Sequence, residues 1–188
     1  MVKAVIFDCF GVVRTNPLDA TYRAFGGDPD EDRQFILDTC YASDIGKLPN
    51  GAGDVLAKHL GVTLEDWTKK SQSIGGKDDQ LIKYIQELRK KYKVGMLSNV
   101  GKGGLGRFFD EGFLESKFDD VVESSHIGFA KPEARAYEIA ADRLGVRLDE
   151  CVFTDDREDY TEGAQHVGMK TILYKNFEDF KKELEKKL

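Results

Sequence analysis

The sequence predicts an α/β fold in which a doubly wound, Rossmann-like parallel sheet carries a small all-helical cap inserted after the first strand. The first observation behind this prediction is a set of short apolar runs at residues 4–7, 94–97, 151–154 and 171–174, with a shorter run centred on 121–122. Uninterrupted runs of this length are typical of strands that are buried on both faces of a parallel sheet. The second observation is that helical patterns separate the runs, and such alternation favours a doubly wound sheet.

The helices of the predicted core domain are recognised by apolar residues that recur at helical spacing over 81–92, 137–144 and 177–188. Pro132 is a residue type favoured at the first helical position, so we expect it to open the second of these helices. Gly145 follows the last apolar residue of the same helix, where a glycine commonly ends a helix.

The third observation is that residues 15–76 contain no convincing strand. Apolar residues at helical spacing predict helices around 35–40 and 52–60, and Thr63 with Asp66 three residues later predicts the start of another. We therefore predict a core domain made of residues 1–14 and 77–188 and a cap made of residues 15–76. An insertion after a strand lies over the edge at which α/β sheets bind their ligands.

Composition narrows the partners and the compartment. The formal net charge is −6 and the pI is about 5.2, which argues against nucleic acid or an acidic membrane as a partner. The three cysteines, Cys9, Cys40 and Cys151, are odd in number and far apart, as in proteins of a reducing compartment. The first residues do not read as a signal peptide, so we expect a cytoplasmic protein, a monomer or weak dimer, with a small anionic substrate.

Polar residues follow the predicted strands or precede a predicted helix at four points. They are Asp8, the pair Ser98 and Asn99, Lys131, and the pair Asp155 and Asp156. The carboxyl ends of parallel strands share one edge of a sheet, so these side chains are expected to meet there.

This set of side chains is suited to phosphoryl transfer. A carboxylate can attack phosphorus and form an aspartyl-phosphate, while a hydroxyl and a lysine hold the phosphate oxygens. Several carboxylates in one place repel one another unless a cation lies between them, and Mg²⁺ prefers carboxylate ligands.

Four segments resemble, in order and spacing, the four motifs of haloacid dehalogenase-like hydrolases. They are residues 5–13 (VIFDCFGVV), 97–99 (LSN), 131–137 (KPEARAY) and 153–159 (FTDDRED) continuing to 162–164 (EGA). The helical stretch is similar to the small C1-type cap that this family places after its first motif. Within the family, the chain resembles the branch of sugar-phosphate phosphatases and the amino-terminal phosphatase of epoxide hydrolases.

The resemblance implies a role for each matched residue. It implies that Asp8 is the nucleophile, that Ser98 and Lys131 are catalytic groups that hold phosphate, and that Asn99 also binds phosphate. It further implies a Mg²⁺ site made of Asp8, Asp155, Asp156 and the backbone carbonyl of Phe10. The function implied is a Mg²⁺-dependent phosphatase of a small phosphorylated metabolite.

Phe10 is the main departure from the family pattern. Phosphatases of the family usually carry their general acid, an Asp, at this position, and the absence of such an acid typically costs about 10² to 10⁴ in rate. True haloacid dehalogenases carry a Tyr there and need no metal. A 2-haloacid dehalogenase and a non-catalytic phosphate-binding or regulatory protein are therefore the alternatives. A smaller departure is Tyr160, where many relatives have Asn.

Other polar features receive ordinary structural interpretations. The run from Gly101 to Gly106 matches the pattern G-x-G-x-x-G, but it begins too late after its strand for dinucleotide binding, so we expect a loop that enters a helix near residues 107–109. We expect Arg14, Arg107 and Arg135 to be solvated.

Overall fold

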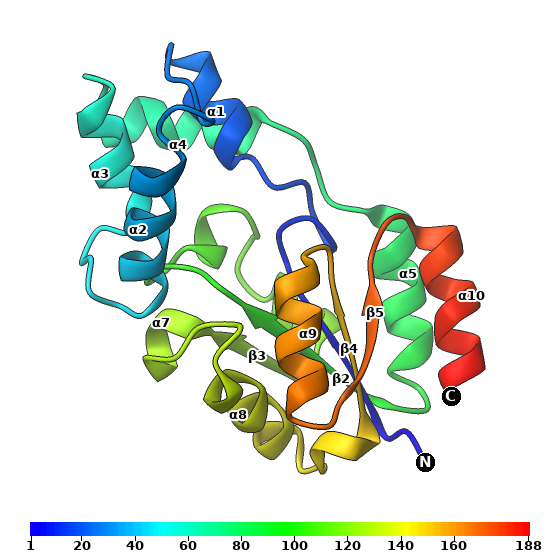
Figure 1. Ribbon diagram of the computed structural model, residues 1–188. Coiled ribbons are helices and arrows are strands. Elements are labelled where there is room, and N and C mark those ends of the chain that lie inside the picture. The colour runs from blue at the N-terminus through cyan, green and yellow to red at the C-terminus, as the bar shows by residue number, and fades with distance from the viewer.

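The computed structural model describes all 188 residues and contains the predicted parallel sheet (Figure 1). Its five strands pair in the order β3-β2-β1-β4-β5, and every pair is parallel. The strands are β1 (Ala4–Phe7), β2 (Lys93–Ser98), β3 (Asp120–Glu123), β4 (Cys151–Asp155) and β5 (Lys170–Leu173). The predicted fold class is thus confirmed, with β1 in the centre of the sheet. No helix combines the length and the apolar character needed to cross a membrane.

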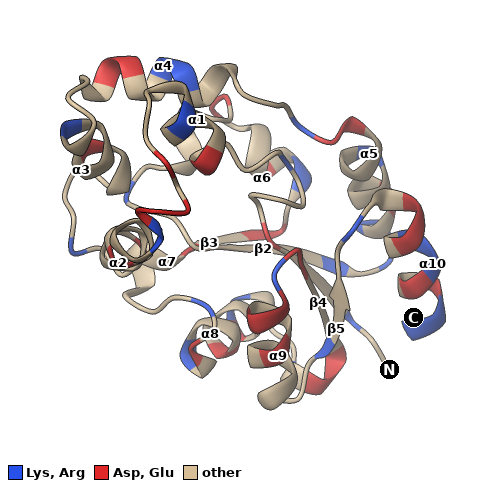
Figure 2. Cartoon of the chain, turned by 45° about the horizontal axis from the view of Figure 1, so that its top comes forward, with Lys and Arg blue, Asp and Glu red and all other residues tan.

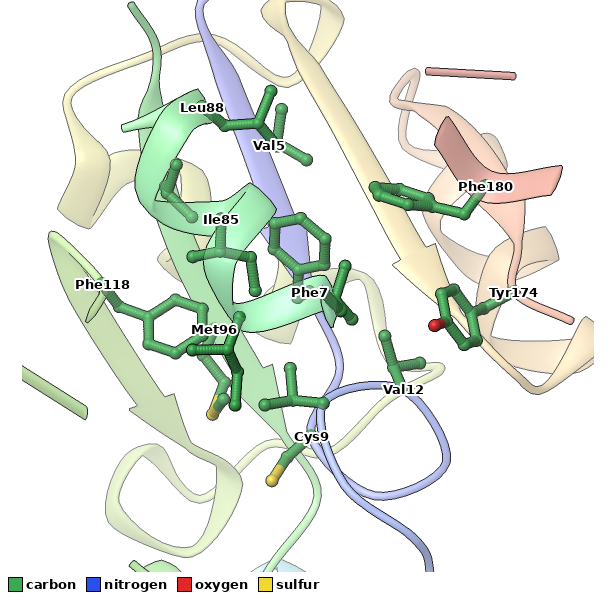
Figure 3. Packing of buried hydrophobic residues seen from close by; sticks show 14 of the residues in the cluster. Val5, Phe7, Cys9, Val12, Ile85, Leu88, Met96, Phe118, Tyr174 and Phe180 are labelled. Carbon is green, nitrogen blue, oxygen red and sulfur yellow. The ribbon is translucent and has the colours of Figure 1, made fainter. Parts of the chain in front are cut away.

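Helices cover both faces of the sheet. On one face, α5 (Asp79–Leu88), α6 (Phe113–Lys117) and α10 (Phe177–Lys187) belong to the same apolar cluster as Val5 and Phe7 (Figure 3). On the other face, α8 (Ala134–Leu144) and α9 (Glu158–His166) pack on the side of Ala4 and Ile6. Successive residues of a strand point to opposite faces, so β1 is apolar throughout because both of its faces are buried. The remaining short elements are α7 (Ser124–Ile127) and the 3₁₀ turns η1 (Leu105–Arg107) and η2 (Leu148–Glu150).

The predicted start of α8 is wrong. This helix begins at Ala134, and Pro132 lies before it in a turn in which the Glu133 N–H donates to the Ala130 carbonyl at 2.8 Å. The Glu133 side chain also accepts from the Ala130 N–H at 3.2 Å, and these bonds close the turn ahead of the helix. Lys131 is therefore held in a turn and does not immediately precede the helix. The predicted end at Gly145 is correct, with φ +72° at this residue.

Four helices lie between β1 and α5, and no strand accompanies them. They are α1 (Leu18–Ala24), α2 (Arg33–Asp44), α3 (Ala52–His59) and α4 (Leu64–Ser73). Figure 1 shows them as a group beside the sheet, and they share a small apolar cluster that includes Tyr22, Ile36 and Trp67. The N-terminal cap of α4 is as predicted, because Thr63 Oγ1 accepts from the Asp66 N–H at 3.0 Å. We call this four-helix group the cap; its division from the core at residues 15 and 76 stays a prediction.

The two chain crossings between core and cap run side by side. The Thr15 N–H donates to the Gly76 carbonyl at 3.0 Å, and the Asp78 N–H donates to the Val13 carbonyl at 2.9 Å. The structure corrects the expectation that Arg14 is solvated, since this residue is only 5% exposed beside these crossings.

The reason for the burial of Arg14 is an aromatic partner. Its guanidinium lies 4.2 Å from the centre of the Phe108 ring and donates to the Ile74 carbonyl at 3.3 Å.

The glycine run from Gly101 to Gly106 leads only into the turn η1 and not into a long helix, so nothing resembling a dinucleotide-binding helix N-terminus follows it.

Candidate active site

The sheet brings the predicted site residues to one edge. Asp8 directly follows β1, Ser98 ends β2 and Asp155 ends β4, and β2 and β4 are the two neighbours of β1. The register pairs Phe7 with Thr154, which places Asp8 beside Asp155 at the carboxyl ends of the strands. The side chains thus meet because the strand order is parallel, as expected from the sequence.

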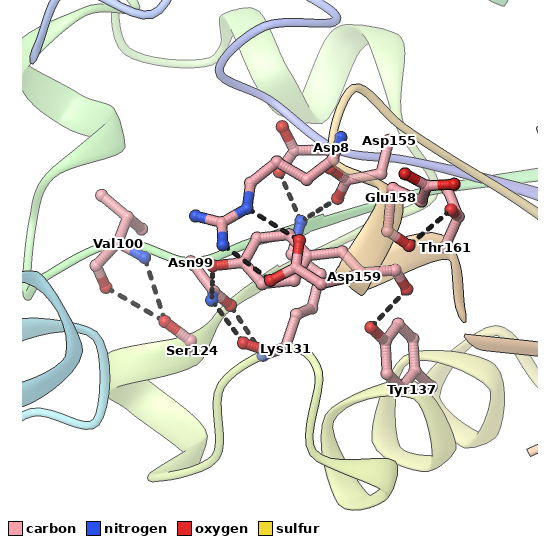
Figure 4. A network of polar contacts seen from close by, with 12 residues as sticks. Asp8, Asn99, Val100, Ser124, Lys131, Tyr137, Asp155, Glu158, Asp159 and Thr161 are labelled. Atoms are coloured by element: carbon pink, nitrogen blue, oxygen red, sulfur yellow. Dashed lines mark hydrogen bonds and ion pairs between the residues drawn. The ribbon is translucent and has the colours of Figure 1, made fainter. Parts of the chain in front are cut away.

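Lys131 joins the two carboxylates at this edge (Figure 4). Its Nζ lies 2.5 Å from Asp8 Oδ1 and 2.6 Å from Asp155 Oδ2, and its side chain is completely buried. Buried ions of opposite charge in hydrogen-bond contact are the arrangement that makes burial of charge tolerable. The turn before α8 therefore places a fixed cation next to the predicted nucleophile.

Burial and the neighbouring charges both shift the pKa values of Asp8 and Lys131. Desolvation raises the pKa of Asp8 to about 7, with Lys131 opposing the shift and Asp155 adding to it. Burial also disfavours the charged form of Lys131, but Asp155 and Asp8 more than offset it, so the pKa of the lysine lies above its usual range. Lys131 thus keeps its charge at neutral pH.

Asn99 holds the Lys131 backbone on both sides. Its Oδ1 accepts from the Lys131 N–H at 2.9 Å, and its Nδ2 donates to the Lys131 carbonyl at 2.9 Å and contacts the Tyr160 hydroxyl at 3.2 Å. Both N–H groups of this amide are thus engaged within the protein. The geometry favours a positioning role over the predicted direct contact with phosphate.

Ser98 has an unused hydroxyl. The residue is completely buried, and its Oγ has no hydrogen-bond partner. Buried polar atoms are nearly always paired, so an unpaired hydroxyl at the end of β2 is what a site for an absent oxygen-rich ligand would leave.

The same two carboxylates form, together with that of Asp156, a donor set suited to a metal ion. One ligand atom each of Asp8, Asp155 and Asp156 lies within 4.8 Å of the others. Burial raises the pKa of Asp156 to about 6, and the neighbouring charge of Asp155 adds to this shift. Hard oxygen ligands crowded in this way fit Mg²⁺, whose charge would relieve their repulsion.

The turn after β1 leaves room for the same site. Gly11 has φ +103°, and a Cβ at this position would collide with the Asp156 carboxylate, so only glycine allows the carboxylate to approach so closely. No backbone N–H donates to the neighbouring Phe10 carbonyl, which is therefore free to serve as the backbone ligand expected from the sequence.

The Phe10 side chain packs against other rings and supplies no proton. Its ring meets Phe108 edge to face with centroids 5.2 Å apart. It lines a cavity of about 670 Å³ above the strand ends, to which the cap contributes residues such as Tyr41, Trp67 and Asp44. Asp44 was not predicted as a site residue, because nothing in a cap helix shows from sequence alone which residue faces the core.

Comparison with known families now identifies the fold family. A model described as haloacid dehalogenase-like hydrolase matches residues 2–168, which is most of the chain. The chain belongs to the haloacid dehalogenase-like hydrolases. It is therefore a hydrolase-family protein, as the four motifs implied.

Individual relatives match over shorter regions. The chain is 38% identical over 91 residues to phosphatase MT3486 of Mycobacterium tuberculosis, covering 47% of this chain and 42% of that protein. It is 36% identical over 73 residues to bifunctional epoxide hydrolase 2 of Sus scrofa, covering 39% of this chain and 13% of that protein. The matched regions are thus less than half the length of these two relatives.

The fold of this haloacid dehalogenase-like chain also matches a solved structure along nearly its whole length. The family enzyme bt-2542 of Bacteroides thetaiotaomicron has a TM-score of 0.80 and 21% identity, covering 97% of this chain and 98% of that chain. The same enzyme has been solved in complex with magnesium and inorganic phosphate. At this identity the likeness concerns the fold alone.

Proposed function

We propose that the protein is a Mg²⁺-dependent phosphatase of a small phosphorylated metabolite that acts through an aspartyl-phosphate on Asp8. The observation that carries this proposal is the contact of Lys131 with both Asp8 and Asp155, beside a third carboxylate at Asp156. A nucleophilic carboxylate next to a fixed cation and a metal-binding donor set suits the transfer of a phosphoryl group. A metal-free reaction at carbon has less use for the second and third carboxylates.

The chain's own residues account for the first steps. The free oxygen of Asp8 attacks phosphorus, while the Lys131 ammonium and the Ser98 hydroxyl bind phosphate oxygens and stabilise the charge that develops on them. Asp8, Asp155, Asp156 and the Phe10 carbonyl would hold the Mg²⁺, which when bound neutralises phosphate charge and keeps the carboxylates ionised. Water then attacks phosphorus, and Asp8 is regenerated.

The relatives support the same reaction class. A phosphatase and a bifunctional epoxide hydrolase match the chain above 35% identity, and the structurally similar bt-2542 enzyme binds magnesium and inorganic phosphate. The sequence regions that match are partial, so the substrate of this chain is not transferred from them.

The test is hydrolysis of p-nitrophenyl phosphate and of a panel of sugar phosphates and nucleotides, with Mg²⁺ and with EDTA. We expect Mg²⁺-dependent turnover that Asp8→Asn abolishes, while Asp142→Asn on the outer side of α8 retains it. The absence of metal-dependent turnover across the panel would overturn the proposal.

Phe10 favours one second candidate, a hydrolase of carbon–halogen bonds, because the family's dehalogenases carry an aromatic residue at that position. Halide release from 2-chloropropionate in EDTA would support this reading. Binding of phosphate measured by calorimetry without turnover of any ester would instead indicate a non-catalytic phosphate-binding protein.

A further inference from the structure

Seven carboxyl groups line the cavity, and nearly all of them have a partner or a place in the metal cluster. Asp8 and Asp155 contact Lys131, Asp159 contacts Arg157, Asp19 contacts Arg33, Asp38 accepts from Gln34, and Asp156 belongs to the metal cluster. The seventh is Asp44, and neither a hydrogen bond nor an ion pair engages its side chain. Asp44 is partly buried and lines the cavity, so its carboxyl is free to contact a ligand there.

The chain on both sides of Asp44 is fixed against the core. Asp44 is the last residue of α2, a helix that contacts α7, and Figure 2 shows these two helices side by side. Before Asp44, Ser43 packs so closely on Gly101 that a Cβ at this glycine would collide with the serine hydroxyl. After it, a Cβ on Gly46 would lie 2.8 Å from the Ser125 carbonyl. The cap therefore touches the loop after β2 and helix α7 after β3 on the two sides of Asp44, which lines the cavity.

The surroundings of Asp44 keep a proton on it near neutral pH. Burial is the largest effect and raises its pKa to about 7, while the positive charges of Lys131 and Arg157 oppose the shift and the negative charge of Asp8 adds to it. These three charges act on Asp44 because they share its cavity. A carboxyl that changes protonation near the working pH is suited to general acid–base catalysis.

We propose that Asp44, delivered by the cap, is the general acid and base that replaces the missing Asp at position 10. The inference rests on the proposed phosphatase function and deepens it. Asp44, Phe10 and Asp8 line the same cavity, so a carboxyl on α2 faces the space in which Asp8 would attack a phosphate ester.

Asp44 alone gives and takes back the proton that the two half-reactions require. In the first, an Asp8 oxygen bonds to phosphorus, the bond from phosphorus to the ester oxygen breaks, and the Asp44 proton passes to that oxygen to release an alcohol. In the second, the Asp44 carboxylate takes a proton from water as the water oxygen bonds to phosphorus. The bond from phosphorus to Asp8 then breaks and releases phosphate.

The experiment compares Asp44→Asn with the wild-type protein on aryl and alkyl phosphate monoesters in saturating Mg²⁺. p-Nitrophenolate leaves without a proton, whereas an alkoxide does not, so the loss depends on the leaving group. The comparison uses kcat/KM, which reports the first half-reaction alone, because hydrolysis of the aspartyl-phosphate is the same for every ester and limits only kcat. We expect kcat/KM to fall by about 10² to 10⁴ for glycerol 2-phosphate and by less than about tenfold for p-nitrophenyl phosphate. The dependence of log kcat/KM on leaving-group pKa should become steeper.

Two further variants make the result decisive. Asp44→Glu retains a proton donor and should recover part of the alkyl phosphate turnover. Glu31→Gln removes a charge from an exposed cap position and should leave the turnover of both esters unchanged. Circular dichroism verifies the folding of each variant.

The two proposals fail in different ways. An equal loss of kcat/KM on both ester classes, or no loss, would overturn the role of Asp44 as the acid while leaving the phosphatase standing. If neither ester is turned over by the wild-type protein, both proposals fall.

Discussion

Asn99 shows how a single residue can fix the position of a buried charge through the backbone of the residue that carries it. Its amide binds the Lys131 N–H and carbonyl, both at 2.9 Å, and so sets the turn from which the lysine reaches Asp8. A buried N–H or carbonyl that loses its hydrogen-bond partner lowers the free energy of unfolding by about 1 to 3 kcal/mol. The role of Asn99 is therefore expected to appear both in stability and in substrate binding.

We predict that Asn99→Ala lowers the free energy of unfolding by about 1 to 3 kcal/mol and raises KM for phosphate esters. Urea denaturation and steady-state kinetics measure the two effects. The control is Asn176→Ala, which removes the N-cap of α10, where Asn176 Oδ1 accepts from the Asp179 N–H at 2.9 Å. This control should lose about 1 kcal/mol without a change in KM. An unchanged KM in Asn99→Ala would contradict the positioning role.

The packing of Phe10 allows a second prediction at a single position. If Asp44 already supplies the proton, Phe10→Asp should change alkyl phosphate turnover little in the wild-type background. In the Asp44→Asn background the same substitution should restore turnover, by up to the about 10² to 10⁴ that a positioned acid contributes. Kinetics of the four proteins form a double-mutant cycle. A large gain in the wild-type background would indicate that no cap residue acts as the acid.

The turn between β1 and Arg14 is the element on which the proposed Mg²⁺ site depends. Gly11 adopts φ +103° there, and the Asp156 carboxylate occupies the space that a side chain would need. We predict that Gly11→Ala weakens Mg²⁺ binding at least about tenfold, since displacement of one carboxylate ligand costs more than 1.4 kcal/mol. The strained backbone should also cost about 1 to 3 kcal/mol of stability.

Gly168→Ala is the matched control for that variant. Gly168 has a similar φ of +93° but nothing within 4 Å of an added Cβ. It should share the loss of stability and leave the Mg²⁺ dependence of turnover and of thermal stability unchanged. Equal Mg²⁺ affinity in both variants would remove Gly11 and Asp156 from the metal site.

Elements governed by local chemistry were predictable from the sequence. The strand runs, the Thr63 cap and the Gly145 end depend on residues a few positions apart, and the structure contains them. Helix α1 was missed because only Thr21 and Tyr22 are buried in it, so it has no apolar stripe to recognise.

The features that depend on distant parts of the chain were not predictable in the same way. The parallel strand order allowed the meeting of Asp8 with Asp155 to be expected, since every strand ends at one edge. In contrast, the burial of Arg14 depends on Phe108, and the place of Asp44 over the site depends on how α2 docks on α7. Neither contact has a local signal in the sequence.

At the scale of the whole molecule, the cavity lies between the cap and the strand ends of the core. Three of the carboxyl groups that line it have pKa values above their ordinary range. Burial raises the pKa of Asp8 and Asp44 to about 7 and that of Asp156 to about 6. In the unfolded chain these groups titrate near 3.8. These three groups thus bind more protons in the folded protein than in the unfolded chain between about pH 4 and 7, so their contribution to stability falls as pH rises through this window.

The direction of this pH dependence leads to a prediction for the melting temperature of Asp44→Asn in EDTA, where no metal ion offsets the negative charge of the carboxylates. Asparagine cannot ionise, so the variant avoids the cost of a buried charge and should melt at a higher temperature than the wild type at pH 8. At pH 4 the two proteins should melt within a degree or two of each other, because Asp44 is protonated in the folded wild type. Each kcal/mol gained corresponds to about 2 to 4 °C for a domain of this size.

Melting curves from pH 4 to 8 measure the effect, with Asp149→Asn as the control. Arg147 holds the pKa of the exposed Asp149 below its usual value, so this variant has the opposite sign, and any small loss should appear only where the Asp149 carboxylate is ionised. A wild type and Asp44→Asn with parallel melting profiles from pH 4 to 8 would mean that folding leaves the pKa of Asp44 at its ordinary value, so that Asp44 is ionised near neutral pH. Such a carboxylate would be unable to serve as the acid of the first half-reaction, because it would hold no proton to give. If the stability profile and the leaving-group kinetics agree, the group that donates the proton to the leaving alcohol is the same Asp44 carboxyl whose ionisation destabilises the folded protein.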